Sequence, residues 1–197
     1  MADGYNYCGG DRSRFVALDL IDRELVTAFR NYINPTKTLK LLRRQGVRGK
    51  PLYCCRVASR MLSERLERAG VTQTKGLTAR LPKELSSTAL HHFVRGLFDG
   101  DGSIFSHVAG LRSNYYRYSW RVVGTLTIVR ELRTVLRSLL GVRASIRQTG
   151  NIHEIYVSGN QQIHTIGTWL YNGATIFLGR KRKRFDLLEA GLPKNGN

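Results

Sequence analysis

Two aspartates close an apolar segment in the second half of the sequence. Phe93 to Phe105 reads FVRGLFDGDGSIF, with one glycine between Asp99 and Asp101. Carboxylates are the ligands that hard divalent cations prefer, and at the C-terminal end of a helix they face the negative end of the helix dipole. A divalent cation would offset that repulsion, so these residue types indicate a metal site. A polar turn is the alternative interpretation.

Two common glycine-rich and aspartate-rich motifs do not fit this segment. An EF-hand calcium loop needs a glycine where Ile104 stands, and a glutamate at its end. A dinucleotide-binding loop places its glycines before the helix, whereas here the predicted helix precedes them. Gly96 and Gly100 lie on one face of that helix, where they would let a second backbone approach closely.

The charge of the chain predicts a polyanionic partner. The sequence has 32 Lys and Arg residues against 14 Asp and Glu residues, which gives a net charge of +18. Such a charge repels itself unless a polyanion binds, and Arg bridges phosphates and guanine edges bidentately. A GC-rich genome would explain part of the arginine excess but not the shortage of acids. We therefore expect the chain to bind nucleic acid.

The sequence gives no sign of a membrane or secreted protein. No apolar run is long enough to span a bilayer, and the N-terminus lacks the pattern of a signal peptide. Cys8, Cys54 and Cys55 lack metal-ligand spacing, so we expect reduced thiols. We expect a protein that is cytoplasmic or nucleoid-associated in a prokaryote, or organellar, and that is not secreted.

The chain contains an internal duplication that organises its elements. Ile21–Ile33 reads IDRELVTAFRNYI and Ile128–Leu140 reads IVRELRTVLRSLL; both have helical spacing and share many residues. After each one comes a predicted strand and then a second helix, at residues 52–57 and 58–69 in the first half and 152–157 and 161–171 in the second. The matched order predicts two repeats, residues 1–80 and 81–197.

The second repeat reads as an α+β half-domain. A helix capped by Ser86 or Ser87 runs to about Phe98, and a later helix ends at Gly141. Strands are predicted at residues 103–108, 115–123, 142–148 and 152–158. Four antiparallel strands backed by helices leave one sheet face without a covering layer.

Arginine alternates along the strands on that uncovered face. We expect a DNA-binding surface rather than a merely solvated one, made by Arg117, Ser119, Arg121, Arg143, Ser145 and Arg147, with Tyr115, Tyr116 and Gln148 close by. The run RKRKR, residues 180–184, predicts phosphate contacts through Arg180 and Lys181. A nuclear localisation signal and a solvated basic helix are the alternatives for this run.

The segment Val94–Gly102, VRGLFDGDG, resembles the motif that names the LAGLIDADG homing endonucleases, and the strand–strand–helix order that follows it agrees. The resemblance covers most of the chain. It implies an α+β fold of two pseudo-symmetric half-domains, each with an antiparallel DNA-binding β-sheet backed by helices. In that family, two motif helices pack side by side, and each delivers its last acid to shared divalent metal ions.

The resemblance also implies roles for individual residues. Asp101 would be catalytic and a metal ligand, Gly100 would offer a backbone carbonyl to the metal, and Asp99 would be structural. Asp3 matches Asp101 as the second catalytic residue and metal ligand, and Ala2 matches Gly100. The implied cofactor is Mg²⁺, or another divalent cation such as Mn²⁺.

The helix that precedes Asp3 in the family pattern lies outside the 197 residues. We expect either upstream residues or a second copy of the chain, as a homodimer, to pair with Ser87–Phe98. The expected function is site-specific cleavage of both strands of duplex DNA, as in intron homing. The alternatives are a catalytically inactive DNA-binding or intron RNA-splicing (maturase-like) protein, and a transcription regulator of the same fold with an added helix-turn-helix domain.

Overall fold

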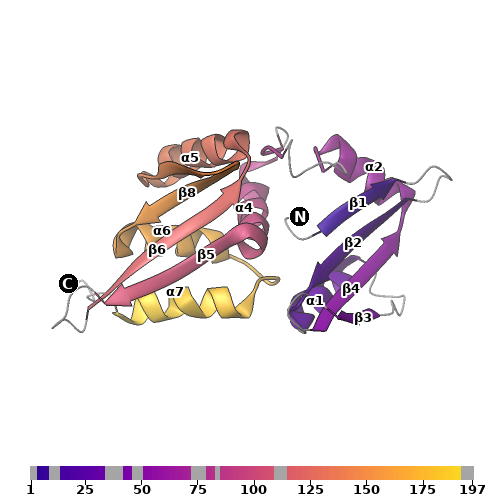
Figure 1. The fold of residues 1–197 in the computed structure, drawn as a ribbon, viewed down its shortest axis with the longest axis horizontal. Coiled ribbons are helices and arrows are strands. Elements are labelled where there is room, and N and C mark those ends of the chain that lie inside the picture. The colour runs from indigo at the N-terminus through magenta and orange to yellow at the C-terminus, as the bar shows by residue number, and fades with distance from the viewer. Residues whose placement is uncertain are drawn as a thin grey trace. The chain divides into compact units, whose positions relative to one another are not determined.

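The computed structural model describes residues 4–8, 14–33, 42–45, 51–71, 79–82, 85–108 and 115–191, with the backbone alone for residues 42–45 and 149. The chain divides into two compact units, Met1–Glu84 and Leu85–Asn197. Each unit contains one antiparallel sheet of four strands (Figure 1). No helix of the described residues is long and apolar enough to cross a membrane.

Unit 1 is a sheet with helices on one side. Its strands pair in the order β1-β2-β4-β3. The elements are β1 (Gly4–Cys8), β2 (Arg14–Leu20), α1 (Arg23–Ile33), β3 (Leu42–Gln45), β4 (Pro51–Ala58) and α2 (Arg60–Arg68). Asn6 attaches β1 to α2, because its side-chain amide donates to the backbone carbonyls of Ser63 and Val71 at 2.9 and 3.2 Å.

The core of unit 1 follows from the alternation of β2 and β4. Leu20, Cys55 and Val57 point to the same side of the sheet and are buried against Val26 of α1. Burial raises the pKa of the Cys55 thiol, which suits a packing role. All three cysteines lie in the described part of the chain, and none forms a disulfide.

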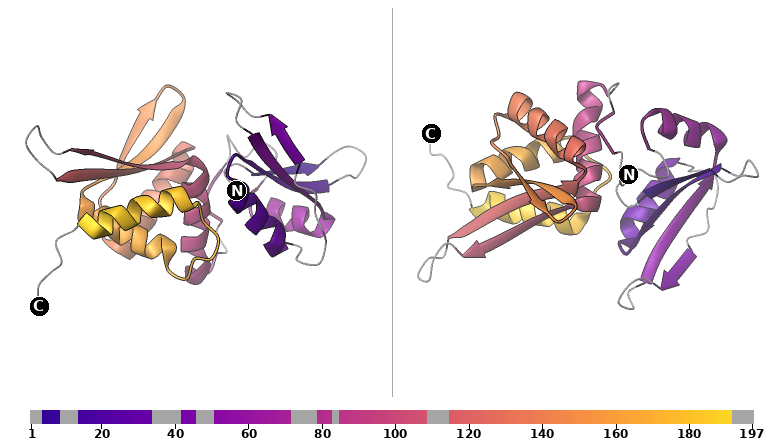
Figure 2. Two further views of the ribbon diagram at one scale, coloured as in Figure 1. Left: turned by 90° about the horizontal axis from the view of Figure 1, so that it is seen from below. Right: turned by 45° about the horizontal axis from the view of Figure 1, so that its top comes forward.

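Unit 2 repeats the sheet topology of unit 1, with the order β5-β6-β8-β7. Its elements are α4 (Ser87–Asp101), β5 (Gly102–Val108), β6 (Tyr116–Gly124), α5 (Leu126–Leu140), β7 (Ser145–Thr149), β8 (Ile152–Ser158), α6 (Asn160–Tyr171) and α7 (Gly179–Gly191). The helices lie on one side of this sheet (Figure 2). The shared strand order supports the duplication predicted from the two similar helices, which are α1 and α5.

The predicted boundaries in unit 2 hold where a cap defines them. Ser86 caps α4, since its hydroxyl accepts from the Ala89 N–H at 3.2 Å. Gly141 ends α5 with a φ of 65°, the left-handed conformation that favours glycine. Two predictions were off: α4 continues past Phe98 through Asp101, and β7 begins at Ser145 rather than at residue 142.

Aromatic packing anchors α4 to the sheet of unit 2. Phe98 stacks on Trp120 of β6 with ring centroids 5.5 Å apart, and Phe185 of α7 meets Phe98 edge-on. Trp120 and Phe98 are both fully buried. The end of α4 is therefore fixed to both β6 and α7, which holds the acidic segment in a defined place.

Candidate metal and nucleic-acid site

Asp101 stands at the junction of helix and sheet. It is the last residue of α4, its side chain is exposed, and Gly102 begins β5 directly after it. A Cβ at Gly102 would lie 2.5 Å from the Phe98 carbonyl oxygen and 2.9 Å from the Phe98 Cα. Glycine therefore allows the chain to turn from α4 into β5 so close to the helix.

Replacing Gly102 by alanine should destabilise unit 2 by about 1–3 kcal/mol, because the new methyl group meets backbone atoms that cannot move alone. Gly96→Ala in the same helix is the matched control: a Cβ there meets nothing within 4 Å. It should be stabilising by up to about 1 kcal/mol through helix propensity. Urea unfolding followed by tryptophan fluorescence measures both, and equal effects of the two variants would contradict the packing argument.

Asp99 points inward and is structural, as expected. Its side chain is 5% exposed, and its Oδ2 accepts from the Leu178 N–H at 3.1 Å, just before α7. Its Oδ1 is buried and has no hydrogen-bond partner among the described residues. Burial raises the pKa of the Asp99 carboxyl to about 6, against the opposing effects of the Leu178 N–H and the Lys181 ammonium.

The raised pKa of Asp99 predicts a stability that depends on pH. The ordinary pKa is 3.8, so between that value and about 6 the folded protein holds a proton that the unfolded chain releases. The stabilisation is complete below the lower pKa and is lost as pH rises through the higher one, by roughly 3 kcal/mol. As the pH rises through this range, the unfolding free energy measured in EDTA should fall for the wild type relative to Asp99→Asn. Parallel curves for the two proteins would contradict the prediction.

Lys181 lies in a different place from the one we expected. Its ammonium is buried at the end of α4, where it donates to the carbonyl oxygens of Phe98 (2.5 Å), Asp99 (2.7 Å) and Gly102 (2.6 Å). These bonds turn Lys181 away from the surface, so the expected surface contact with DNA phosphates is corrected. The ammonium instead places a positive charge at the negative end of the helix dipole, at the end of α4 that Asp101 closes.

The donor chemistry at the end of α4 suits a hard cation. Mg²⁺ is commonly held by one or two carboxylates together with water and substrate phosphates. Asp101 offers an exposed carboxylate, and Gly100 offers a backbone carbonyl in the preceding position. No group of three His, Cys, Asp or Glu side chains gathers within the described ranges. Asp3 and Ala2 lie outside those ranges, so their roles stay predictions.

The sheet face opposite the helices of unit 2, here called the open face, carries arginine from two strands. The pairing places Arg121 of β6 opposite Ser103 on one side and Tyr156 on the other, and Arg147 of β7 opposite Glu154. Arg117 lies farther along β6, opposite His107. All three arginines are exposed, so the expected arginine-rich face is present.

Contacts among its side chains organise the open face. Arg121 donates to the Ser103 hydroxyl at 2.8 Å and pairs with Glu154 at 3.4 Å, while the Arg147 guanidinium lies 3.7 Å from the centre of the Tyr156 ring. These contacts hold the two guanidiniums against the sheet, which lowers the entropy cost of binding a phosphate or a base edge. Glu154 and Tyr156 were missed in the sequence, although their alternation along β8 places them on this face.

The other residues expected on this face have different outcomes. Ser119 lies on the open face but is buried beneath Tyr156, to whose hydroxyl it is hydrogen-bonded at 2.7 Å. Arg143 precedes β7 and lines a groove with α5, and Gln148 occupies the opposite side of β7 from Arg147, with its amide bonded to the Gly150 carbonyl at 2.9 Å. Ser145 keeps its place on the open face opposite Tyr156. Tyr115 and Tyr116 are exposed at the start of β6, and Arg180 is exposed on α7, on the helical side of the sheet.

Unit 1 has an open face that the sequence did not reveal. Its helix-free side gathers aromatic side chains, with Tyr7 stacked on Phe15 at 4.7 Å and Tyr5 edge-on to Phe15 at 6.0 Å. Arg56 of β4 lies 5.0 Å from the Phe15 ring centre and donates to the Tyr5 hydroxyl at 3.3 Å. Aromatic rings and arginine together suit contact with nucleic acid.

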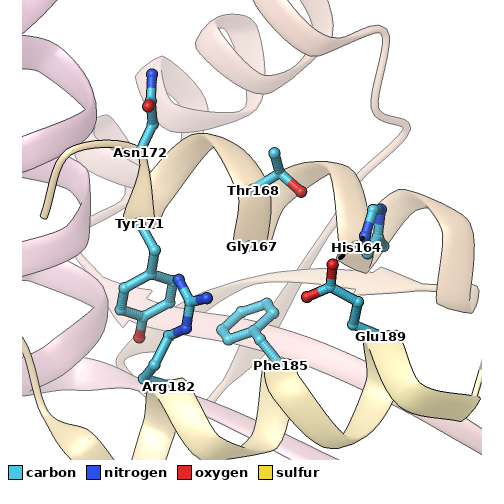
Figure 3. Close-up of a pocket in the computed structure, with 8 residues that line it drawn as sticks. All are labelled: His164, Gly167, Thr168, Tyr171, Asn172, Arg182, Phe185 and Glu189. Atoms are coloured by element: carbon cyan, nitrogen blue, oxygen red, sulfur yellow. Dashed lines mark ion pairs between the residues drawn. The ribbon is translucent and has the colours of Figure 1, made fainter.

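A pocket of about 210 Å³ lies between α6 and α7, on the helical side of unit 2. Figure 3 shows Arg182 next to the ring of Tyr171, with Phe185 beneath Gly167, and His164 facing Glu189. The His164 and Glu189 side chains are 4.0 Å apart. The pocket borders neither Asp101 nor the open face, so we interpret it as a packing gap between the two helices.

The structure resembles solved proteins over nearly its whole length. It is similar to the LAGLIDADG meganuclease I-AabMI bound to uncleaved DNA, with a TM-score of 0.58 and 14% identity over 96% of this chain and 86% of that one. It is also similar to the LAGLIDADG homing endonuclease I-SmaMI bound to cleaved DNA, with a TM-score of 0.60 and 14% identity over 96% and 85% of the two chains.

A third solved structure is also similar. Full-length DUF199/WhiA from Thermatoga maritima matches with a TM-score of 0.52 and 13% identity, over 98% of this chain and 58% of that chain. A scan of the sequence against protein-family models finds no match, and no curated protein matches at a significant level. These similarities show that the chain has the fold of the LAGLIDADG homing endonucleases.

Proposed function

We propose that this chain, which has the fold of the LAGLIDADG homing endonucleases, is a metal-dependent endonuclease that cleaves duplex DNA at a specific site. One observation carries the proposal: in unit 2 the acidic end of α4 runs without a break into β5 of the sheet that bears the arginine-rich open face. One continuous segment, α4 and β5, would then fix the position of a metal held by Asp101 relative to DNA held by the open face.

In the proposed reaction, Asp101 would hold Mg²⁺ or a similar divalent cation, which would supply Lewis-acid stabilisation of the charge that develops on the phosphodiester. Lys181 fixes the end of α4, and Asp99 ties it to α7, so that Asp101 keeps its position as DNA binds. Asp3 is the proposed second carboxylate, with Ala2 before it.

The open face supplies the proposed grip on DNA. Arg117, Arg121 and Arg147 are its cations. Tyr115, just before β6, and Arg180 of α7 are proposed as further DNA contacts outside the open face. The aromatic open face of unit 1 is a second contact surface in this proposal. A DNA substrate agrees with a location in the cytoplasm or nucleoid of a prokaryote, or in an organelle. The partner of the exposed Gly96 face of α4, either an upstream helix or a second copy of the chain, also stays a proposal.

A DNA-binding protein without cleavage is the second candidate, because the arginines of the open face can hold DNA without a metal at Asp101. DUF199/WhiA, which is not named as an endonuclease, shares the fold. An intron RNA-splicing role belongs with this candidate. The two candidates share DNA or RNA binding by the open face and differ in the need for Asp101.

The proposed DNA contact predicts a change in salt dependence. A target is first selected by binding from a randomised duplex library, and its affinity is then measured by fluorescence anisotropy at several salt concentrations. Each lost phosphate contact should lower the slope of log K against log salt by about 0.9, so Arg117→Gln/Arg121→Gln should lower it by roughly 1.8. Arg65→Gln/Arg68→Gln, on exposed positions of α2, removes the same charge as the control. An equal loss in both double variants would show a general charge effect and contradict the assignment.

A further inference from the structure

A groove on unit 2 carries arginines that the open face does not use. It lies between α5 and the segment that leads into β7, and its volume is about 860 Å³. Its cationic side chains are Arg133 and Arg137 of α5 and Arg143 before β7. Thr134, Ser138, Val142 and Ala144 complete the lining, so short side chains form the rest of the groove.

The positive charge of this groove is not compensated within the described residues. All three arginines are exposed, and no ion pair between described residues includes any of them. By contrast, Arg121 and Arg147 share Glu154, and Arg182 pairs with Asp186 at 2.7 Å. Arg133 and Arg137 are also one helical turn apart, a spacing at which like charges destabilise a helix. A bound anion would remove that cost.

The fold alone does not require these arginines. The negative end of the α5 dipole would favour a cation in the last turn, which accounts for Arg137 but not for Arg133 or Arg143. In the internal repeat, Ile21 corresponds to Ile128, and Arg133 therefore corresponds to Val26, which is buried in unit 1. An equivalent helix thus forms without an arginine at this position.

The lining of the groove favours phosphate over bases. The hydroxyls of Thr134 and Ser138 donate to carbonyls of their own helix, at 3.2 and 2.9 Å, and the Arg143 N–H donates to Gln162 at 2.6 Å. The guanidiniums therefore remain as donors to a ligand. Among the described residues no aromatic side chain lines the groove, so that lining lacks the stacking surface on which single strands are bound.

We propose that this groove binds backbone phosphates of duplex DNA that flanks the segment held by the open face. The bases of a duplex are turned inward, which suits a groove that offers guanidiniums and no stacking surface. β7 is the edge strand of the sheet, and the groove lies where β7 begins. DNA that passes over this edge reaches Arg133, Arg137 and Arg143. The inference rests on the proposed DNA binding by the open face.

The test compares Arg133→Gln/Arg137→Gln with the control pair Arg65→Gln/Arg68→Gln. Salt titrations use the library-selected target in a duplex that extends several helical turns beyond it, and a second duplex trimmed to the target itself. On the long duplex the groove variant should lose roughly 1.8 from the slope of log K against log salt, while the control keeps the wild-type slope. On the trimmed duplex the groove variant should match the wild type. Arg133→Lys/Arg137→Lys, which keeps the charge, should retain most of the slope.

Several outcomes overturn the inference. The inference is wrong if, on the long duplex, the groove variant loses no more slope than the control. It is also wrong if the groove variant loses as much slope on the trimmed duplex as on the long one. A loss seen only with a single-stranded probe of equal length would mean that the groove holds a single strand.

The variant Arg117→Gln/Arg121→Gln is measured in parallel. If it lowers the slope and the groove variant does not, the groove inference fails while DNA binding by the open face stands. If wild-type affinity for duplex DNA does not depend on salt, the proposed DNA binding itself fails. Equal melting temperatures show that each variant is folded.

Discussion

Asp101→Asn should abolish metal-dependent cleavage while leaving DNA binding intact. The amide keeps the size of the side chain but removes the negative charge that attracts a divalent cation at the end of α4. Removing a residue that hydrogen-bonds to a metal ligand typically lowers metal affinity or activity about 10–100-fold. Loss of the ligand itself should therefore lower the cleavage rate by at least about 100-fold. Affinity for the target in EDTA should stay the same or rise, because one negative charge near the phosphates is gone.

The control for this prediction is Asp186→Asn. Asp186 is an exposed carboxylate of α7 that pairs with Arg182 at 2.7 Å and lies outside the proposed site. Its variant should cleave at a rate close to that of the wild type. Cleavage is followed on a plasmid that carries the selected target, with Mg²⁺ as the only divalent cation. Undiminished cleavage by Asp101→Asn would show that the metal assignment is wrong.

Lys181→Met should be the most destabilising single change in the acidic segment. The variant deletes three charge-assisted hydrogen bonds and leaves the carbonyls of Phe98, Asp99 and Gly102 without their donor. A hydrogen bond to a charged group contributes about 1.5–3 kcal/mol, and removing a buried charge recovers part of its desolvation cost. We expect a net loss of about 2–4 kcal/mol in the free energy of unfolding.

The same helix offers a matched control for Lys181. Lys183 is exposed, and Lys183→Met should change stability by no more than about 0.5 kcal/mol. Both tryptophans, Trp120 and Trp169, belong to unit 2, so fluorescence-detected urea unfolding reports that unit alone. If the two methionine variants unfold alike, Lys181 does not clamp the end of α4.

Much of the fold could be predicted because local signals agreed with the global topology. The similar helices α1 and α5 indicated the repeat, and both sheets have the same strand order. Caps such as Ser86 and Gly141 fixed helix ends through side-chain or backbone chemistry that is local in sequence. The segment before β7 was misread because its apolar Val142 fits a strand pattern, yet Val142 bonds back to the end of α5.

The site could be predicted only where one element determines it. The motif placed Asp99 and Asp101 at the end of one helix, and the structure gives them the expected different environments: Asp99 is buried and Asp101 is exposed. The metal-binding role of Asp101 stays a prediction. Lys181 was misplaced because its partners, the carbonyls at the end of α4, lie about 80 residues earlier in the sequence. A basic run gives no periodic signal that tells its one buried lysine from its solvated neighbours. The aromatic face of unit 1 was missed because β1 and β2 are short and lie before the first recognisable helix.

The central claim is that the protein cuts duplex DNA with a divalent metal, and one measurement tests it most directly. The wild-type chain is incubated with a plasmid that carries its selected target, in Mg²⁺ and in EDTA, beside a plasmid without the target. We predict a single double-strand break at the target in Mg²⁺, and no cleavage in EDTA or of the second plasmid. An intact plasmid in Mg²⁺, with the target nevertheless bound, would contradict the claim and leave a DNA-binding protein that shares the fold.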